Sequence, residues 1–165
     1  NAGSLPYTVV TGDFDGDGDA DLASAGQTSD EVTVFLQSQA GEFVAQPPLQ
    51  VGFDPSVLAA DVDGDEHLDL VTSSQSGTQV WHYTEGRFSR GPFVADSVAA
   101  IGDLDNDGDV DLASPWTVWY QDAALAFSAR PLPAPAATWP TAADLDGDGD
   151  LDLISNSLEV WFGRQ

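Results

Sequence analysis

The sequence predicts an all-β fold: a β-propeller of four-stranded antiparallel blades, with four repeats in the chain. A nine-residue aspartate-rich segment occurs four times, and its copies begin at Asp13, Asp61, Asp103 and Asp144, which are 48, 42 and 41 residues apart. A period of about 40 to 50 residues is typical of solenoids and propellers, in which each repeat is one supersecondary unit. The residues between the copies form short strand-like runs, and no segment has the pattern of a long amphipathic helix.

Each repeat contains strand-like segments in the same order. A short run rich in Val, Ala and Thr precedes the acidic segment, and a second strand begins at the leucine that follows it. The third is rich in β-branched and aromatic residues, which favour a pleated sheet, and a fourth follows another turn. We expect first strands at 7–11, 56–60, 97–101 and 138–142, second strands from Leu22, Leu70, Leu112 and Leu153, third strands at 32–36, 79–83, 117–120 and 158–162, and fourth strands at 41–44, 86–88 and 125–127.

We expect a single propeller domain over residues 1–165. The last repeat ends before a fourth strand, and residues 1–6 could complete that blade and close a four-bladed ring. A fragment of a larger ring, or self-association of two chains into eight blades, agrees equally with the sequence, because propellers have about four to eight blades. The blades are expected at about 7–50, 51–96, 97–136 and 137–165.

The acidic segments follow the pattern Asp-x-Asp-x-Asp-Gly-x-x-Asp. Two carboxylates 4 Å apart repel by about 4 kcal/mol at an effective dielectric of about 20, so such a loop requires a cation. Calcium takes six to eight oxygen ligands and suits alternate carboxylates of a tight loop together with a backbone carbonyl. We predict about four Ca²⁺ ions, bound by the side chains at positions one, three, five and nine and by the carbonyl at position seven. In that order of positions the ligands are Asp13, Asp15, Asp17, Asp21 and the carbonyl of Asp19; Asp61, Asp63, Asp65, Asp69 and the carbonyl of His67; Asp103, Asp105, Asp107, Asp111 and the carbonyl of Asp109; and Asp144, Asp146, Asp148, Asp152 and the carbonyl of Asp150.

The second loop departs from the pattern at its sixth position. It has Glu66 where the other loops have Gly18, Gly108 and Gly149. Glycine adopts a positive φ without steric cost, whereas another residue there costs about 1 kcal/mol or more. We therefore expect the second loop to be the weakest calcium site.

With these loops and the leucine after each, the sequence resembles the FG-GAP or VCBS-type calcium-binding β-propeller repeats of integrin α-subunits and of many secreted microbial proteins. The resemblance covers essentially the whole chain, and it implies calcium in the loop between the first two strands of each blade. Family members usually have seven blades, against four repeats here. No Gly-Ala-Pro segment occurs at the corresponding places, which favours the microbial type; those places are 23–24, 71–72, 113–114 and 154–155.

Composition excludes several classes of partner. The formal net charge is −24, from 28 acidic residues against four arginines and no lysine. Nucleic acid and an anionic membrane are therefore unfavourable partners, because no basic patch is available to bind phosphate. No apolar run approaches the roughly 20 residues that span a bilayer. The absence of cysteine says nothing of the compartment, and we expect an extracellular or cell-surface location because millimolar calcium is available there.

The sequence contains no pattern typical of a catalytic site. All close pairs of acids belong to the loops, His67 and His82 form no cluster, and neither histidine side chain is predicted to bind metal or transfer protons. No nucleophile motif occurs. We expect a non-catalytic binding or adhesion scaffold for a protein or glycan ligand. The alternative is an accessory or structural module of a larger secreted enzyme or adhesin.

Five tryptophans fall into two groups. Trp81, Trp119 and Trp161 occupy equivalent strand positions and are expected to pack within the blades. Trp116 and Trp139 break this register. Either could be exposed and stack on a sugar or could pack like the others, and the sequence leaves both open.

Overall fold

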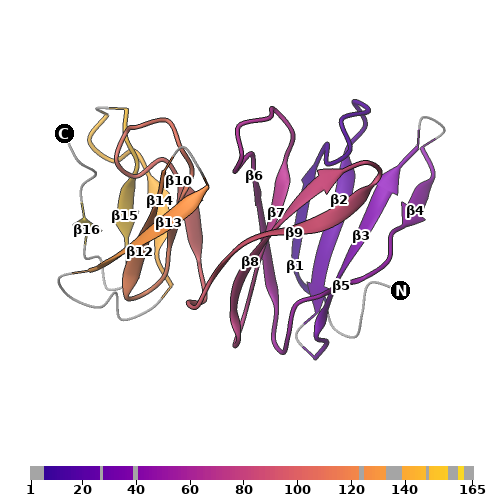
Figure 1. The fold of residues 1–165 in the computed structure, drawn as a ribbon, viewed down its shortest axis with the longest axis horizontal. Helices are drawn as coiled ribbons and strands as arrows, with labels where there is room; N and C mark the ends of the chain where they lie inside the picture. The colour runs from indigo at the N-terminus through magenta and orange to yellow at the C-terminus, as the bar shows by residue number, and fades with distance from the viewer. Residues whose placement is uncertain are drawn as a thin grey trace. The chain divides into compact units, whose positions relative to one another are not determined.

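The computed structural model describes residues 6–26, 28–38, 41–122, 125–132, 139–147, 149–155 and 160–161 (Figure 1). All regular structure in these residues is β-strand, arranged in four antiparallel sheets in which strands follow one another in chain order. Such meanders are the blades of β-propellers, so the predicted fold class is confirmed. The described part of the chain contains no helix that is long and apolar enough to cross a membrane.

The four sheets repeat one strand order. The first contains β1 (Pro6–Gly12), β2 (Asp21–Gly26), β3 (Glu31–Gln37) and β4 (Phe43–Ala45), with β5 (Leu49–Gln50) paired to β3. The second contains β6 (Ser56–Ala60), β7 (Asp69–Ser74), β8 (Gly77–Thr84) and β9 (Arg87–Val94). The third contains β10 (Ala100–Gly102), β11 (Asp111–Ala113), β12 (Thr117–Asp122) and β13 (Ala126–Pro131). The fourth contains β14 (Thr141–Ala143), β15 (Asp152–Ile154) and β16 (Val160–Trp161).

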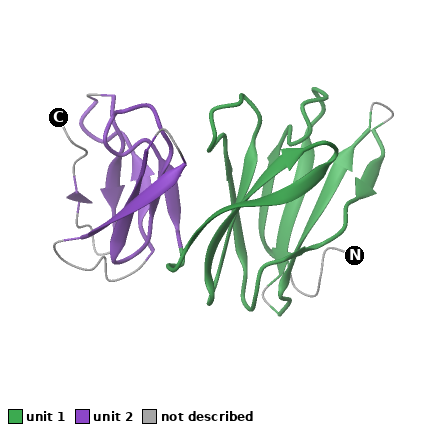
Figure 2. Cartoon of the chain, in the orientation of Figure 1, with its two compact units in different colours: residues 1–97 green, residues 98–165 purple. Residues whose placement is uncertain are grey.

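The chain divides into two compact units, residues 1–97 and 98–165 (Figure 2). The first unit holds the first and second sheets, and the second unit holds the third and fourth. The strand that would complete the fourth sheet was expected from residues 1–6, and residues 1–5 lie outside the described part of the chain. Closure of a ring therefore stays a prediction.

Most predicted strands lie where the sequence places them, with small shifts. Every second strand begins at the ninth residue of its acidic segment, one residue before the expected leucine. The strand expected at 97–101 begins only at Ala100, although the Ala99 N–H already donates to the carbonyl of Ala113 at 2.9 Å. β5 was not predicted, and β13 extends to Pro131, beyond the strand expected at 125–127. Residues 138, 158–159 and 162 of other expected strands lie outside the described residues.

The second residue of the acidic segment anchors the loop to the hydrophobic core. Phe14 and Val62 are almost completely buried, and so is Leu104 in the third repeat. In the first unit, Phe14 packs with Val34, Leu70 and other residues of both sheets. The first three loops are thus fixed to the blades through one apolar side chain, whereas the equivalent Leu145 of the fourth loop is 49% exposed.

The small residue before the loop is required by the next repeat. A Cβ atom at Gly12 would lie 2.4 Å from Cδ1 of Leu68, and one at Gly102 would lie 2.3 Å from Cδ1 of Leu151. Both leucines occupy the eighth position of the following loop. At Gly12 and Gly102, the crowding comes from this neighbouring leucine.

The tryptophans divide as the sequence suggests. Trp81, Trp119 and Trp161 each pair with the leucine that follows the acidic segment of their own sheet, which confirms their equivalence. Trp116 and Trp139 are each 61% exposed. Exposure, one of the two alternatives that the sequence leaves open for these residues, is the one observed.

Candidate metal sites

The first aspartate of each loop organises the turn. In the first loop, Asp13 accepts hydrogen bonds from the N–H groups of Gly16 at 2.8 Å and Gly18 at 2.9 Å. In the second, Asp61 accepts from Gly64 at 2.8 Å and from Glu66 at 2.9 Å. The backbone therefore curls around the first carboxylate and leads the following acids back toward it.

Two positions in each loop require a left-handed backbone. At position six, φ is 91° for Gly18 and 70° for Glu66, so the glutamate adopts the conformation that glycine prefers. Sequence reasoning missed position four, where φ is also positive. The residues there are Gly16, Gly64, Asn106 and Gly147, with φ of 75°, 74°, 59° and 80°. Asparagine is the non-glycine residue that tolerates this region best, so the Gly/Gly/Asn/Gly pattern was the available signal.

The ninth aspartate joins the loop to the sheet. It begins the second strand, and in all four repeats it is buried. One of its oxygens accepts the N–H of the second loop residue, for example from Leu104 to Asp111 at 2.8 Å. The other oxygen of Asp111 accepts the N–H of Gln121 on the third strand at 2.9 Å, and Asp21 accepts that of Gln37 at 2.8 Å. A single carboxylate thus connects the loop, the second strand and the third strand.

The loops gather carboxylate oxygens closely enough to share an ion. The described part of the chain contains four groups of three aspartates. Each aspartate offers one carboxylate oxygen, and the three oxygens of a group lie within 4.8 Å of one another. The groups are Asp13, Asp15 and Asp17; Asp61, Asp63 and Asp65; Asp103, Asp105 and Asp111; and Asp144, Asp146 and Asp152. Asp21, Asp69 and Asp107 are not in these four groups, and Asp148 lies outside the described residues.

The residue at loop position seven holds the carboxylate at position five in place. The N–H groups of Asp19, His67 and Asp109 each donate at 2.9 Å to the carboxylate two residues earlier. Coordination by the carbonyls of these residues and of Asp150 stays a prediction. The Asp19 side chain has one buried oxygen, Oδ2, without a hydrogen-bond partner. Burial of an unsatisfied oxygen is costly unless a cation lies nearby.

Gathering these acids is electrostatically unfavourable in the absence of a cation. Burial raises the pKa of Asp111 to about 6, and the nearby Asp105 and Asp107 raise it further against the effect of its backbone hydrogen bonds. Burial also raises the pKa of Asp69 to about 6, although His82 acts in the opposite direction. Each shift measures how poorly the folded loop tolerates the ionised carboxylate. A hard dication with oxygen ligands would remove this penalty, and the donor set of the loops fits such an ion.

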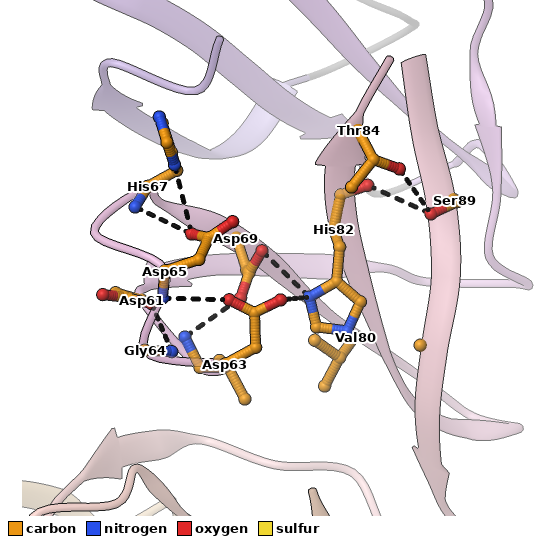
Figure 3. A network of polar contacts seen from close by, with 12 residues as sticks. Asp61, Asp63, Gly64, Asp65, His67, Asp69, Val80, His82, Thr84 and Ser89 are labelled. Atoms are coloured by element: carbon orange, nitrogen blue, oxygen red, sulfur yellow. Dashed lines mark hydrogen bonds and ion pairs between the residues drawn. The ribbon is translucent and has the colours of Figure 1, made fainter. Parts of the chain in front are cut away.

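The second loop is approached by a histidine that sequence reasoning missed. Nδ1 of His82, on β8, lies 3.1 Å from Oδ2 of Asp63 and 3.1 Å from Oδ1 of Asp69 (Figure 3). The signal was available in the strand register. Because Leu70 pairs with Trp81, the residues next to them, Asp69 and His82, are cross-strand neighbours.

A cavity of about 540 Å³ lies in the first unit, between the segment 46–50 and strands β8 and β9. Trp81, Phe88 and two of the four arginines, Arg87 and Arg90, line it. The Arg90 guanidinium lies 5.1 Å from the Trp81 ring centre and donates to the carbonyl of Gln50 at 3.2 Å. In an otherwise anionic chain, this cavity is a locally cationic and aromatic surface.

The repeated meanders and acidic loops define a β-propeller repeat protein with candidate metal loops. The chain belongs to the FG-GAP-like repeat family, whose model matches residues 13–72, 61–114 and 103–155. The family predicted from the loops and their leucines is thereby confirmed. A comparison with curated proteins finds no match.

Two solved structures are similar in fold. One is a lectin of Agrocybe aegerita, whose structure is described as the basis of specific recognition of non-reducing terminal N-acetylglucosamine; it is 17% identical, with a TM-score of 0.61 over 91% of this chain and 47% of the lectin. The other is the biofilm matrix protein Bap1 of V. cholerae, 16% identical, with a TM-score of 0.55 over 98% of this chain and 30% of that protein. The chain therefore spans less than half the length of either.

Proposed function

We propose that this chain is a calcium-binding, extracellular and non-catalytic β-propeller module that recognises a glycan or protein ligand. The observation that carries the proposal is the loop geometry, in which backbone N–H groups hold converging carboxylates in every repeat. The oxygen-only donor sets of the first, third and fourth loops favour calcium over softer ions. The similarity to a lectin and to a biofilm matrix protein supports a binding role and an extracellular location.

Calcium is proposed to act structurally. Each ion would bridge a loop whose ninth residue is bonded to two strands, so ion binding would stabilise the blade as well as the loop. An ion whose free concentration is tenfold above its dissociation constant stabilises the folded state by about 1.4 kcal/mol. Three such sites, in the first, third and fourth loops, would contribute about 4 kcal/mol, a substantial share of the roughly 5 to 15 kcal/mol typical of a domain.

Replacing Asp107 with asparagine tests this role. The carboxylate is exposed and accepts the N–H of Asp109 at 2.9 Å, a bond that an asparagine oxygen can keep. We expect the melting temperature in calcium to fall by about 3 to 6 °C, from the loss of about 1.4 kcal/mol at one site. In metal-free buffer the melting temperature should stay close to that of the wild type.

Asp122→Asn is the matched control for thermal unfolding, because Asp122 is also exposed and also accepts a backbone N–H, from Ala126 at 3.1 Å. It lies outside the acidic loops, so calcium should stabilise this variant as much as the wild type. Equal losses for Asp107→Asn in calcium and in metal-free buffer would contradict a metal role for the third loop.

A glycan array probed with and without calcium tests the ligand. The exposed Trp116 and Trp139 offer stacking surfaces for sugar rings. We expect calcium-dependent binding to a subset of glycans, with at least a tenfold weaker signal for Trp116→Ala or Trp139→Ala. Binding that is unchanged in both variants would contradict these stacking surfaces. A blank array, together with full folding in calcium, would favour the alternative of an accessory module in a longer protein, which the partial coverage of both similar structures also supports.

A further inference from the structure

The second metal loop faces a nitrogen donor at a position where two other repeats have none. The register pairs Leu22 with Phe35, Leu70 with Trp81 and Leu112 with Trp119. The next residue on the third strand is therefore equivalent in each repeat. These residues are Leu36, His82 and Tyr120.

The His82 ring is placed as a ligand would be. Nδ1 lies 3.1 Å from both Oδ2 of Asp63 and Oδ1 of Asp69, it is inaccessible to solvent, and neither contact has hydrogen-bond geometry (Figure 3). The nitrogen thus faces both oxygens at the same distance, as happens when several ligands surround a shared ion. Adjacent ligands of an ion with bonds of about 2.0 to 2.2 Å are roughly 3 Å apart, which is the spacing seen here.

The neighbouring strand is shaped to accommodate this ring. A Cβ atom at Gly91 would lie 2.1 Å from Nε2 of His82 and 2.5 Å from its Cδ2, so only glycine leaves room for the imidazole. The register between β8 and β9 shifts between Gln79 and Trp81, and the Gln79 amide donates to the carbonyls of Gly91 at 2.8 Å and of Pro92 at 2.9 Å. Such bulges often redirect a side chain beside a functional site.

We propose that the second loop is a mixed nitrogen–oxygen site, in which His82, Asp63 and Asp69 bind a first-row transition-metal dication such as Zn²⁺ in preference to Ca²⁺. Imidazole is a good ligand for zinc, copper and nickel, whereas calcium takes oxygen ligands. Asp61 and Asp65 converge with Asp63 in the same loop and are available to complete the ligand set. The low calcium affinity that we expect of the second loop, because of Glu66, would then go together with its preference for a transition-metal ion.

Zinc titration in millimolar calcium, followed by calorimetry, tests the proposal. The wild type should bind one Zn²⁺ per chain in this background. His82→Leu should weaken zinc binding at least about tenfold, as loss of a metal-site residue does. Leucine is the residue at the equivalent position of the first blade, so the variant is compatible with the fold. Gly91→Ala, which retains every ligand but displaces the ring, should weaken zinc binding in the same direction.

His67→Gln identifies which of the two histidines supplies the nitrogen. This second histidine is half exposed, and its Nδ1 lies 3.3 Å from Oδ1 of Asp65 in the same loop. Asp122→Asn, which lies outside the acidic loops, is the control for affinity and should leave zinc binding unchanged. Pulsed electron paramagnetic resonance with Cu²⁺ as the probe should detect an imidazole nitrogen in the wild type and in His67→Gln, and lose it in His82→Leu.

Three results would overturn the proposal: no zinc binding in millimolar calcium, unchanged zinc affinity in His82→Leu, or loss of the nitrogen signal in His67→Gln instead. The first two would leave His82 as an ion-pair partner of Asp63 and Asp69 only. The proposal can also be separated from calcium binding elsewhere. Calcium at the other loops without zinc at the second refutes this inference alone, whereas zinc at the second loop with no calcium anywhere refutes the proposed calcium role alone.

Discussion

Replacing Asp111 with alanine is expected to destabilise the protein in calcium by about 3 to 7 kcal/mol, well beyond the effect of Asp107→Asn in the same loop. The side chain is fully buried and accepts backbone N–H groups from Leu104 and Gln121. Each buried N–H left without an acceptor costs about 1 to 3 kcal/mol, and loss of the ion would add about 1.4 kcal/mol. Urea unfolding in calcium measures the difference.

The two variants separate two roles of aspartate in one loop. Asp107 is predicted to contribute through the ion alone, whereas Asp111 also holds β11 and β12 to the loop. In metal-free protein at neutral pH, the loss at Asp111 should be smaller, because alanine also removes a buried charge. Equal unfolding free energies for both variants in calcium would show that the backbone bonds of Asp111 contribute nothing.

The metal-free protein is expected to lose stability as the pH rises from about 4 to about 7. The folded-state pKa values of Asp69 and Asp111, about 6, lie above the ordinary value of 3.8, and those of Asp15 and Asp63 are raised as well. A carboxyl group whose pKa is raised in the folded state stabilises that state most when it is protonated. Its contribution to stability is therefore full below about pH 4 and is lost as the pH rises through about 6. For Asp111 the shift corresponds to about 3 kcal/mol.

Calcium should reverse this trend, because the ion binds ionised carboxylates and protons compete with it. Urea unfolding at several pH values, in metal-free buffer and in calcium, measures both curves. Asp111→Asn, which removes one titrating group and keeps its shape, should flatten the metal-free curve. A metal-free protein that gains stability between pH 4 and 7 would contradict the electrostatic account of the loops.

The features that the sequence revealed are those encoded locally. Four repeats of one acidic pattern predicted the loops, and the alternation of strand and turn signals predicted the blades. The leucine after each loop marked the second strand to within one residue. These inferences need only neighbours along the chain, because loop conformation and strand propensity depend on nearby residues.

The features that the sequence concealed depend on pairing between strands. His82 lies 13 residues after Asp69 in the chain, and only the pairing of β7 with β8 brings them together. The side chain that requires a small residue at Gly12, Leu68, belongs to the next repeat, so the contact cannot be read from neighbours along the chain. The positive φ at position four of the loop was overlooked for a different reason. The only sequence signal for this backbone conformation is the presence of glycine or asparagine at that position.

The contact between Gly12 and Leu68 bears on how such proteins can be re-engineered. The two residues form a junction that spans consecutive repeats, and Gly102 with Leu151 forms a second one in the other unit. A graft that moves one repeat without regard to its junction would place a bulky residue against leucine or leave a void. A transplantable segment that keeps its junction would therefore run from the small residue before one loop to the eighth position of the next loop, as residues 12–68 and 102–151 do.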